Sequence, residues 1–152
     1  MKLLPEDKLA WSPIVVNSRM NRERNASGIN SYEKEFKFKP EEYLASKISD
    51  YGKASWLDLC CGQGKALVQT AEYFDKLGQQ NSINLKGIDL IDTFLTVDKH
   101  ITCVQFEAKS LNEWSPDQNY DLITCVHGLH YLGDKLKLIE TSIAALKSNG
   151  VF

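Results

Sequence analysis

The sequence predicts an α/β domain with a doubly wound, mainly parallel sheet. Short apolar runs alternate along the chain with segments of helical period. The runs are apolar at consecutive positions, which is typical of strands that helices cover on both faces. A glycine-containing turn joins the first of these runs directly to a helical segment, as in a strand–turn–helix unit.

The chain is expected to form one domain, with an N-terminal arm and helix over residues 1–54 and a core over residues 55–152. A length of 152 residues suits one domain with a hydrophobic core. Within the first part, residues 18–35 are polar and contain little that could fill a core. We therefore expect a mobile arm or lid there.

A helix is expected from Pro40, because proline is favoured in the first turn of a helix. The next two residues, Glu41 and Glu42, suit the positive end of the helix dipole. The helical period places Leu44, Ile48 and Tyr51 on one face of this helix.

From Ser55 onward, strands and helices alternate. Strands are predicted at four apolar runs: residues 56–60, 85–90, 101–108 and 119–126. The helix after the first strand is predicted to bury Ala66, Leu67, Thr70, Ala71 and Phe74. The link at residues 91–100 is short for a full crossover helix, so we expect a short or irregular element there.

The segment after Gly133 predicts an amphipathic helix with a face of Leu136, Ile139, Ile143 and Leu146. The helix is expected to close at residues 148–150, and residues 151–152 to open a fifth strand. A complete domain rarely ends inside a buried strand, so we expect a C-terminally truncated chain that lacks the last strands. The open sheet edge then favours a homodimer that pairs or covers it.

The composition argues against several functions. A net charge of −2 and a pI of about 5.9 give no general attraction to nucleic acid. No apolar run approaches the ~20 residues that cross a bilayer, and the first residues lack the apolar core of a secretory signal, so a cytoplasmic location is expected.

The four cysteines (Cys60, Cys61, Cys103 and Cys125) lack metal-ligand spacing. Free thiols are favoured there over a metal site or a disulfide.

The chemistry is concentrated in the turn after the first strand, LDLCCGQG at residues 57–64. Gly62 and Gly64 let the backbone turn tightly and approach a ligand closely. The helix that begins near Gly64 offers unpaired N–H groups and a positive dipole end, which suit an anionic group. In open α/β sheets the ligand lies beyond the carboxyl ends of the strands.

Asp89 ends the second strand, 25 residues after Gly64. An acidic residue at this place accepts hydrogen bonds from a ribose diol, so the two features together predict a nucleoside-bearing ligand. In the structural alternative, the glycines only make a turn and Asp89 caps a helix. The functional interpretation is favoured because both features fall at the ends of adjacent strands. The glycine spacing disfavours a nicotinamide enzyme.

Four segments resemble the motifs of class I S-adenosylmethionine-dependent methyltransferases, which share a Rossmann-like core. In order, these segments are LDLCCGQGKAL, GIDL, YDLITCVHGLHYL and AALKSNGVF. They extend over roughly residues 55–152. A weaker match, NSRMNRERNASGINSYEKEF, is similar to an N-terminal arm of some bacterial members. The resemblance implies S-adenosylmethionine as the cofactor, and we expect a small-molecule methyl acceptor.

The resemblance also implies the cofactor-binding residues: Tyr32, Asp58, Cys60, Gly62, Gly64, Asp89, Leu90, Ser110 and Val126. The residues of the glycine turn would line the methionine portion, and Asp58 would help to hold its amino group. Asp89 would bind the ribose hydroxyls, with Leu90 on the adenine. Tyr32 would close over the cofactor carboxylate.

Two positions depart from the family pattern. Cys60 stands where the family usually has glycine, and its Cβ would crowd the ligand. Lys109 takes the place of an acid that contacts the adenine amine in many members, which leaves Ser110 for that hydrogen bond.

Methyl transfer needs alignment of the acceptor and sometimes a base. His127 and His130 follow the fourth strand, so we hypothesise that one of them orients or deprotonates the acceptor. In the alternative, His130 packs under Tyr131 and His127 only fills space beside the cofactor. The chief rival function is a truncated cofactor-binding or dimerisation module with little or no catalysis.

Overall fold

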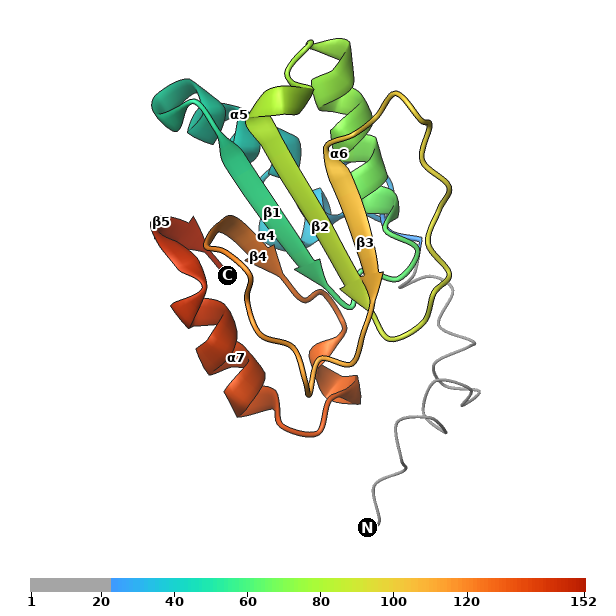
Figure 1. Cartoon of the computed structure of the whole chain (residues 1–152), viewed down its shortest axis with the longest axis vertical. Helices are drawn as coiled ribbons and strands as arrows, with labels where there is room; N and C mark the ends of the chain where they lie inside the picture. The colour runs from blue at the N-terminus through green and yellow to red at the C-terminus, as the bar shows by residue number, and fades with distance from the viewer. Residues whose placement is uncertain (1–22) are drawn as a thin grey trace.

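A computed structural model describes residues 23–152, which form one sheet of five parallel strands flanked by helices (Figure 1). The strand order is β3-β2-β1-β4-β5. The strands are β1 (Ala54–Leu59), β2 (Ile83–Asp89), β3 (Val104–Ala108), β4 (Tyr120–Thr124) and β5 (Leu146–Val151). Successive strands extend the sheet first to one side of β1 and then to the other. The predicted doubly wound parallel sheet is therefore confirmed.

The helices cover both faces of the sheet. They are α4 (Tyr32–Phe36), α5 (Pro40–Tyr51), α6 (Lys65–Lys76) and α7 (Lys135–Ala144), with 3-10 turns η1 (Gln80–Ser82) and η2 (Leu129–Tyr131). Figure 1 shows α5 and α6 on one face and α7 on the other. Because side chains alternate along a strand, Trp56 of β1 packs in the core beneath α5 and α6, whereas Leu57 and Leu59 pack on the α7 side.

The first two expected helices lie where the sequence placed them. α5 begins at Pro40 and buries Leu44, whereas Tyr51, from the same predicted face, is 61% exposed. Tyr51 is the last residue of the helix, where the chain leaves the sheet through Gly52. All five residues predicted to line the inner face of α6 are buried, which confirms that prediction.

The last helix and strand correct the sequence prediction. α7 ends at Ala144, and Leu146 already belongs to β5, as does the segment at residues 148–150. The buried residues here are Leu138, Ser142 and Ala145, whereas Leu136 is 79% and Ile143 is 56% exposed. Apolar residues lie on two stripes of this segment, and packing against the sheet selects the stripe that includes Leu138.

The link between β2 and β3 contains no helix, as expected, and it is anchored by buried Ile101 and Cys103. No helix within residues 23–152 combines the length and the apolar character that crossing a bilayer requires.

The arm is better packed than its polar sequence suggests. Residues 18–22 lie outside the described part, but Ala26, Ser31 and Tyr32 are buried, which corrects the prediction that this segment adds little to the core. The side chain of Gln69 on α6 accepts hydrogen bonds from the backbone N–H groups of Ala26 and Ser27, at 2.8 and 3.4 Å. The segment before α5 is thus tied to α6.

Candidate functional site

The carboxyl ends of β1, β2 and β4 meet at one edge of the sheet. Asp58 of β1 lies opposite Gly87 of β2 on one side and Thr124 of β4 on the other. The turn after β1 therefore stands between the segments that follow β2 and β4, where open α/β sheets bind their ligands.

The turn after β1 uses left-handed backbone at three positions. Gly62 and Gly64 have φ values of 61° and 74°, and Cys60 has a φ of 57°, which is uncommon for a residue with a side chain. Gly64 is the residue before α6, and a Cβ on it would lie 2.1 Å from the ring of Phe106 on β3. The motif thus needs glycine at position 64 both for its conformation and for close packing.

Asp89 holds this turn from the end of β2. Its carboxylate accepts hydrogen bonds from the backbone N–H of Gly62 at 2.8 Å and from that of Ile91 at 3.1 Å. The backbone N–H of Cys61 also donates to the carbonyl of Ile88, at 3.1 Å. The two features that the sequence predicted to act together, the glycine turn and the acid after β2, are therefore in direct contact.

Asp58 lies beneath the turn in a buried network. It accepts hydrogen bonds from the hydroxyl of Tyr32 at 2.8 Å and from that of Thr124 at 2.6 Å. The indole N–H of Trp56 donates in turn to the Thr124 hydroxyl, at 2.8 Å. Burial raises the pKa of Asp58 to about 7, and burial together with the nearby Asp58 raises the pKa of Tyr32.

Asp58 is fully buried and Tyr32 nearly so, and the Tyr32 hydroxyl donates its hydrogen bond to Asp58. The structure therefore places these two predicted cofactor residues under the turn, as a link between α4, β1 and β4. Thr124 and Trp56 complete this network. Thr124 lies in the fourth-strand motif, but sequence reasoning assigned neither residue a role in the site.

The adenine side of the predicted site lies at the ends of β2 and β3. Leu90 follows β2 and is 36% exposed. The backbone N–H of Lys109 donates to the carbonyl of Asp89 at 2.9 Å, which keeps the next residue, Ser110, beside that strand end. The Ser110 hydroxyl accepts a hydrogen bond from the backbone N–H of Asn112, at 3.2 Å.

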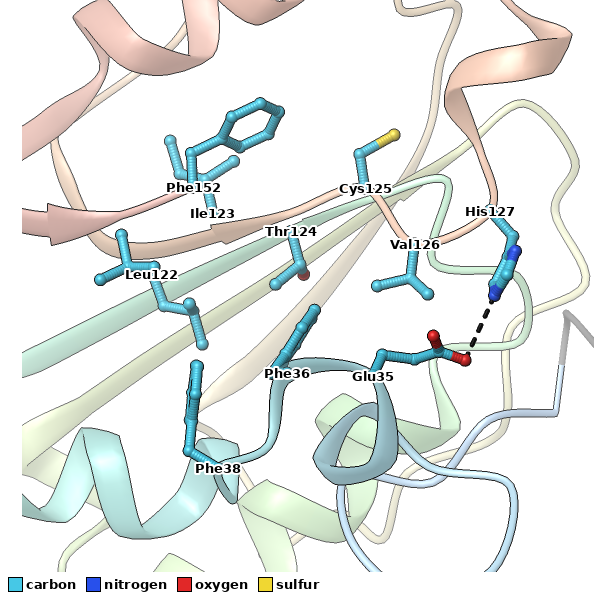
Figure 2. Close-up of a pocket in the computed structure, with 11 residues that line it drawn as sticks. Glu35, Phe36, Phe38, Leu122, Ile123, Thr124, Cys125, Val126, His127 and Phe152 are labelled. Atoms are coloured by element: carbon cyan, nitrogen blue, oxygen red, sulfur yellow. Dashed lines mark hydrogen bonds and ion pairs between the residues drawn. The ribbon is translucent and has the colours of Figure 1, made fainter.

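Val126 and His127 follow β4, as expected, and His127 has a carboxylate partner. Its Nε2 lies 3.3 Å from Oε1 of Glu35 on α4, and the Arg24 guanidinium lies 2.6 Å from the same oxygen. Figure 2 shows the Glu35 and His127 side chains pointing toward one another. The hydrogen bonds from Arg24 and then from His127 lower the pKa of Glu35.

Sequence reasoning missed Glu35, because 92 residues separate it from His127 and the arm match that contains it gave it no role. His130 lies on η2 with its ring 3.9 Å from that of Tyr131, centroid to centroid, which agrees with the structural alternative for this residue.

An open pocket of about 380 Å³ runs beside β4 (Figure 2). Its polar end contains Glu35, Thr124 and His127, and its apolar residues include Phe36, Phe38, Leu122, Val126 and Phe152. β5 pairs with β4 at Tyr120 and Leu122, so within the described residues the edge of β4 after Leu122 has no strand beside it and borders this pocket.

Known proteins share this architecture. Among solved structures, the plantazolicin methyltransferase BpumL in complex with SAH has a TM-score of 0.59 at 18% identity, covering 93% of this chain and 52% of that chain. CalS10, an amino pentose methyltransferase from Micromonospora echinaspora solved with SAM bound, has a TM-score of 0.51 at 17% identity, covering 97% of this chain and 55% of that one. The chain thus spans about half the length of these proteins, and the likeness concerns the fold.

A search of curated proteins found no match. The family described as "Methyltransferase domain" matches residues 22–152, which includes the glycine turn, Asp89 and the segment after β4. The chain therefore belongs to the methyltransferase domain family, as its resemblance to the class I S-adenosylmethionine-dependent enzymes predicted.

Proposed function

We propose that this chain binds S-adenosylmethionine and transfers its methyl group to a small-molecule acceptor. The contact between Asp89 and the backbone of Gly62 carries this proposal, because it joins a ribose-binding acid to a glycine turn at the edge of the sheet. Relatives of the same fold were solved with SAH or SAM bound, which supports the choice of cofactor.

The residues at this edge fit the cofactor. The turn at Gly64 leads into the N-terminus of α6, which suits a carboxylate. A carboxylate such as Asp89 can accept several hydrogen bonds at once, including those of a ribose diol. Leu90 and Ser110 would border the adenine, and Val126 would face the sulfonium.

Cys60, the main departure from the family pattern, is accommodated because a glycine, Gly128, lies beside it. A Cβ on Gly128 would lie 2.5 Å from the Cβ and 2.7 Å from the Sγ of Cys60. The side chain of Cys60 thus turns toward the loop after β4, where Gly128 leaves room for it. Its direction allows the backbone of the turn to line the methionine portion.

The pair of His127 and Glu35 would act on the acceptor. A neutral histidine that donates from Nε2 to the Glu35 carboxylate keeps Nδ1 as a proton acceptor. We place the acceptor at the polar end of the pocket, where Nδ1 would take the proton of an amine or hydroxyl as it is methylated. When bound, the cofactor supplies an electrophilic methyl group on a positively charged sulfur.

Formation of S-adenosylhomocysteine with a panel of small amines and alcohols tests this function. His127→Ala is expected to lower turnover by about 100-fold, the usual size of a general-base effect, with cofactor binding retained. His100→Ala, which changes a histidine on the link before β3, is the control and should match the wild type. A loss at His130→Ala in place of His127→Ala would reassign the base. Cofactor binding without turnover on any acceptor would favour a binding module.

We also propose that the chain forms a homodimer. The apolar part of the pocket, with Phe36, Phe38 and Phe152, lies along the uncovered edge of β4, and exposed sheet edges are usually paired or covered. Light scattering after size-exclusion chromatography should give twice the monomer mass. Phe38→Ser is expected to shift that mass toward the monomer, and a monomeric wild type at micromolar concentration would contradict the proposal.

We also propose that the protein is located in the cytoplasm. All four cysteines are free thiols, which are typical of a reducing compartment.

A further inference from the structure

Two of the four cysteines meet at the cofactor end of the sheet. Cys60 directly follows β1 and Cys125 directly follows β4, and these strands are neighbours, with Asp58 opposite Thr124. A Cβ on Gly128 would lie 2.7 Å from Sγ of Cys60 and 2.9 Å from Sγ of Cys125. Both sulfur atoms therefore border the same small space, which Gly128 leaves open.

We propose that Cys60 and Cys125 are a modification site, a dithiol that a low-molecular-weight disulfide converts into an intramolecular disulfide and that thereby controls cofactor binding. Proximity of the two sulfur atoms is the first requirement for such a bond. The thiol of Cys60 is largely buried, whereas Cys125 is partly exposed, so a small oxidant can reach Cys125 first.

The neighbouring thiol of Cys61 is not an alternative partner. Its sulfur faces the opposite side of the turn, where it would lie 2.8 Å from a Cβ on Gly87 of β2, and it is buried. Cys103 precedes β3, on the far side of β2 from β1, and is also buried. Among the four cysteines, Cys60 and Cys125 are thus the pair that the fold brings together.

The reaction is a thiol–disulfide exchange with a small disulfide RSSR, such as glutathione disulfide. The Cys125 thiolate attacks one sulfur of RSSR, forms a mixed disulfide and releases one RS⁻. The Cys60 thiolate then attacks the Cys125 sulfur, closes the protein disulfide and releases the second RS⁻. The two protein protons end on the two released thiols, so two protein thiols are oxidised and one RSSR is reduced.

The rate of this exchange depends on how much of each thiol is deprotonated. The hydrogen bond with Cys125 is the largest cause that raises the pKa of Cys60, followed by burial. This hydrogen bond is lost once Cys125 is in a mixed disulfide, so the second step becomes easier after the first. The reaction is expected to be slow at neutral pH and faster near pH 8.5, where more thiolate is present.

The disulfide would act on the cofactor site through the glycine turn. It would tie Cys60, two residues before Gly62, to the loop that carries Val126 and His127. Since the cofactor is proposed to lie between this turn and this loop, the covalent bond would fix their separation and prevent them from adjusting around it. This consequence rests on the proposed function, whereas formation of the disulfide does not.

The experiment treats the whole chain with glutathione disulfide at pH 8.5, alkylates the remaining thiols under denaturing conditions and maps peptides by mass spectrometry. A peptide pair linked through Cys60 and Cys125 is expected, with Cys61 and Cys103 alkylated. Cys103→Ser should still form the link and Cys125→Ser should not. Four alkylated cysteines, or a different pairing, would overturn the proposal.

Calorimetry with S-adenosylhomocysteine then compares the oxidised and reduced chains. Oxidation is expected to weaken binding by at least about tenfold, with recovery after dithiothreitol. Equal binding by both forms, with the link present, would overturn the control of cofactor binding. Absence of binding by the reduced chain would count against the proposed function, while the mass spectrum would still decide whether the disulfide forms.

Discussion

At the scale of single residues, the site includes the carboxyl group of Asp58, which is fully buried. Asp58 is enclosed by Tyr32 and Thr124, and its burial raises its pKa to about 7. An acid at the same place in an open turn would keep an ordinary pKa. The sequence located Asp58 inside a buried strand, but its proton equilibrium follows from the packing of α4 against that strand.

The stability of the fold should therefore depend on the protonation of Asp58. Its pKa is raised from 3.8 in the unfolded chain to about 7 in the fold, so between these values the folded chain holds a proton that the unfolded chain releases. The contribution of this group is complete below about pH 4 and is lost as the pH rises through 7.

Urea unfolding at several pH values checks this dependence, with Asp58→Asn as the reference that cannot titrate. The free energy of unfolding of the wild type minus that of the variant should fall by up to about 4 kcal/mol between pH 4 and pH 8. A difference that stays level, or that rises with pH, would show that Asp58 is charged in the folded chain at low pH.

Gly64 permits a second test at this scale. Gly64→Ala should destabilise the fold by about 2–4 kcal/mol, through its left-handed backbone and the clash with Phe106. Gly78→Ala is the matched control, since Gly78 has a φ of 66° with no atom within 4 Å of an added Cβ, and it should cost only about 1 kcal/mol. Equal losses in urea unfolding would contradict the close packing of the turn on β3.

At the scale of elements, the buried elements were predictable and the exposed ones were not. Strands β1 and β4 are buried at every position, so they are apolar runs in the sequence. β5 has mostly exposed residues and includes the polar stretch at 148–150, so its sequence gives no strand signal before Val151. Position at the edge of the sheet, rather than local preference, makes it a strand.

α7 shows the same limit for a helix, because its apolar residues occupy two stripes. Leu138→Ala should cost about 2–4 kcal/mol of unfolding free energy, since this side chain is 5% exposed in the core on the α7 side. Leu136→Ala removes the same atoms from a side chain that is 79% exposed and should change stability by less than about 0.5 kcal/mol. A larger loss of unfolding free energy for Leu136→Ala than for Leu138→Ala would instead support the buried face expected from the sequence.

At the scale of the whole molecule, the fold determines which distant residues form the site. Parallel strands bring the glycine turn, Asp89 and the segment after β4 to one edge, so these motifs could be placed together from the sequence. The pairing of Glu35 with His127 and the approach of Cys60 to Cys125 could not, because they depend on how α4 and the loops pack. Local motifs therefore predicted which segments meet at this edge, and tertiary packing determines the contacts made by residues outside those motifs.

The central claim is that Asp89 and the glycine turn bind the cofactor. Calorimetric titration of S-adenosylhomocysteine into the wild type, Asp89→Asn and Asp92→Asn tests it most directly. Asp92 is an exposed acid three residues further on, so its variant controls for the loss of one charge. We expect Asp89→Asn to weaken binding by at least about tenfold, because it removes one or more charge-assisted hydrogen bonds. Asp92→Asn should bind the cofactor as the wild type does. Equal binding by all three proteins, or no binding by the wild type, would contradict the account.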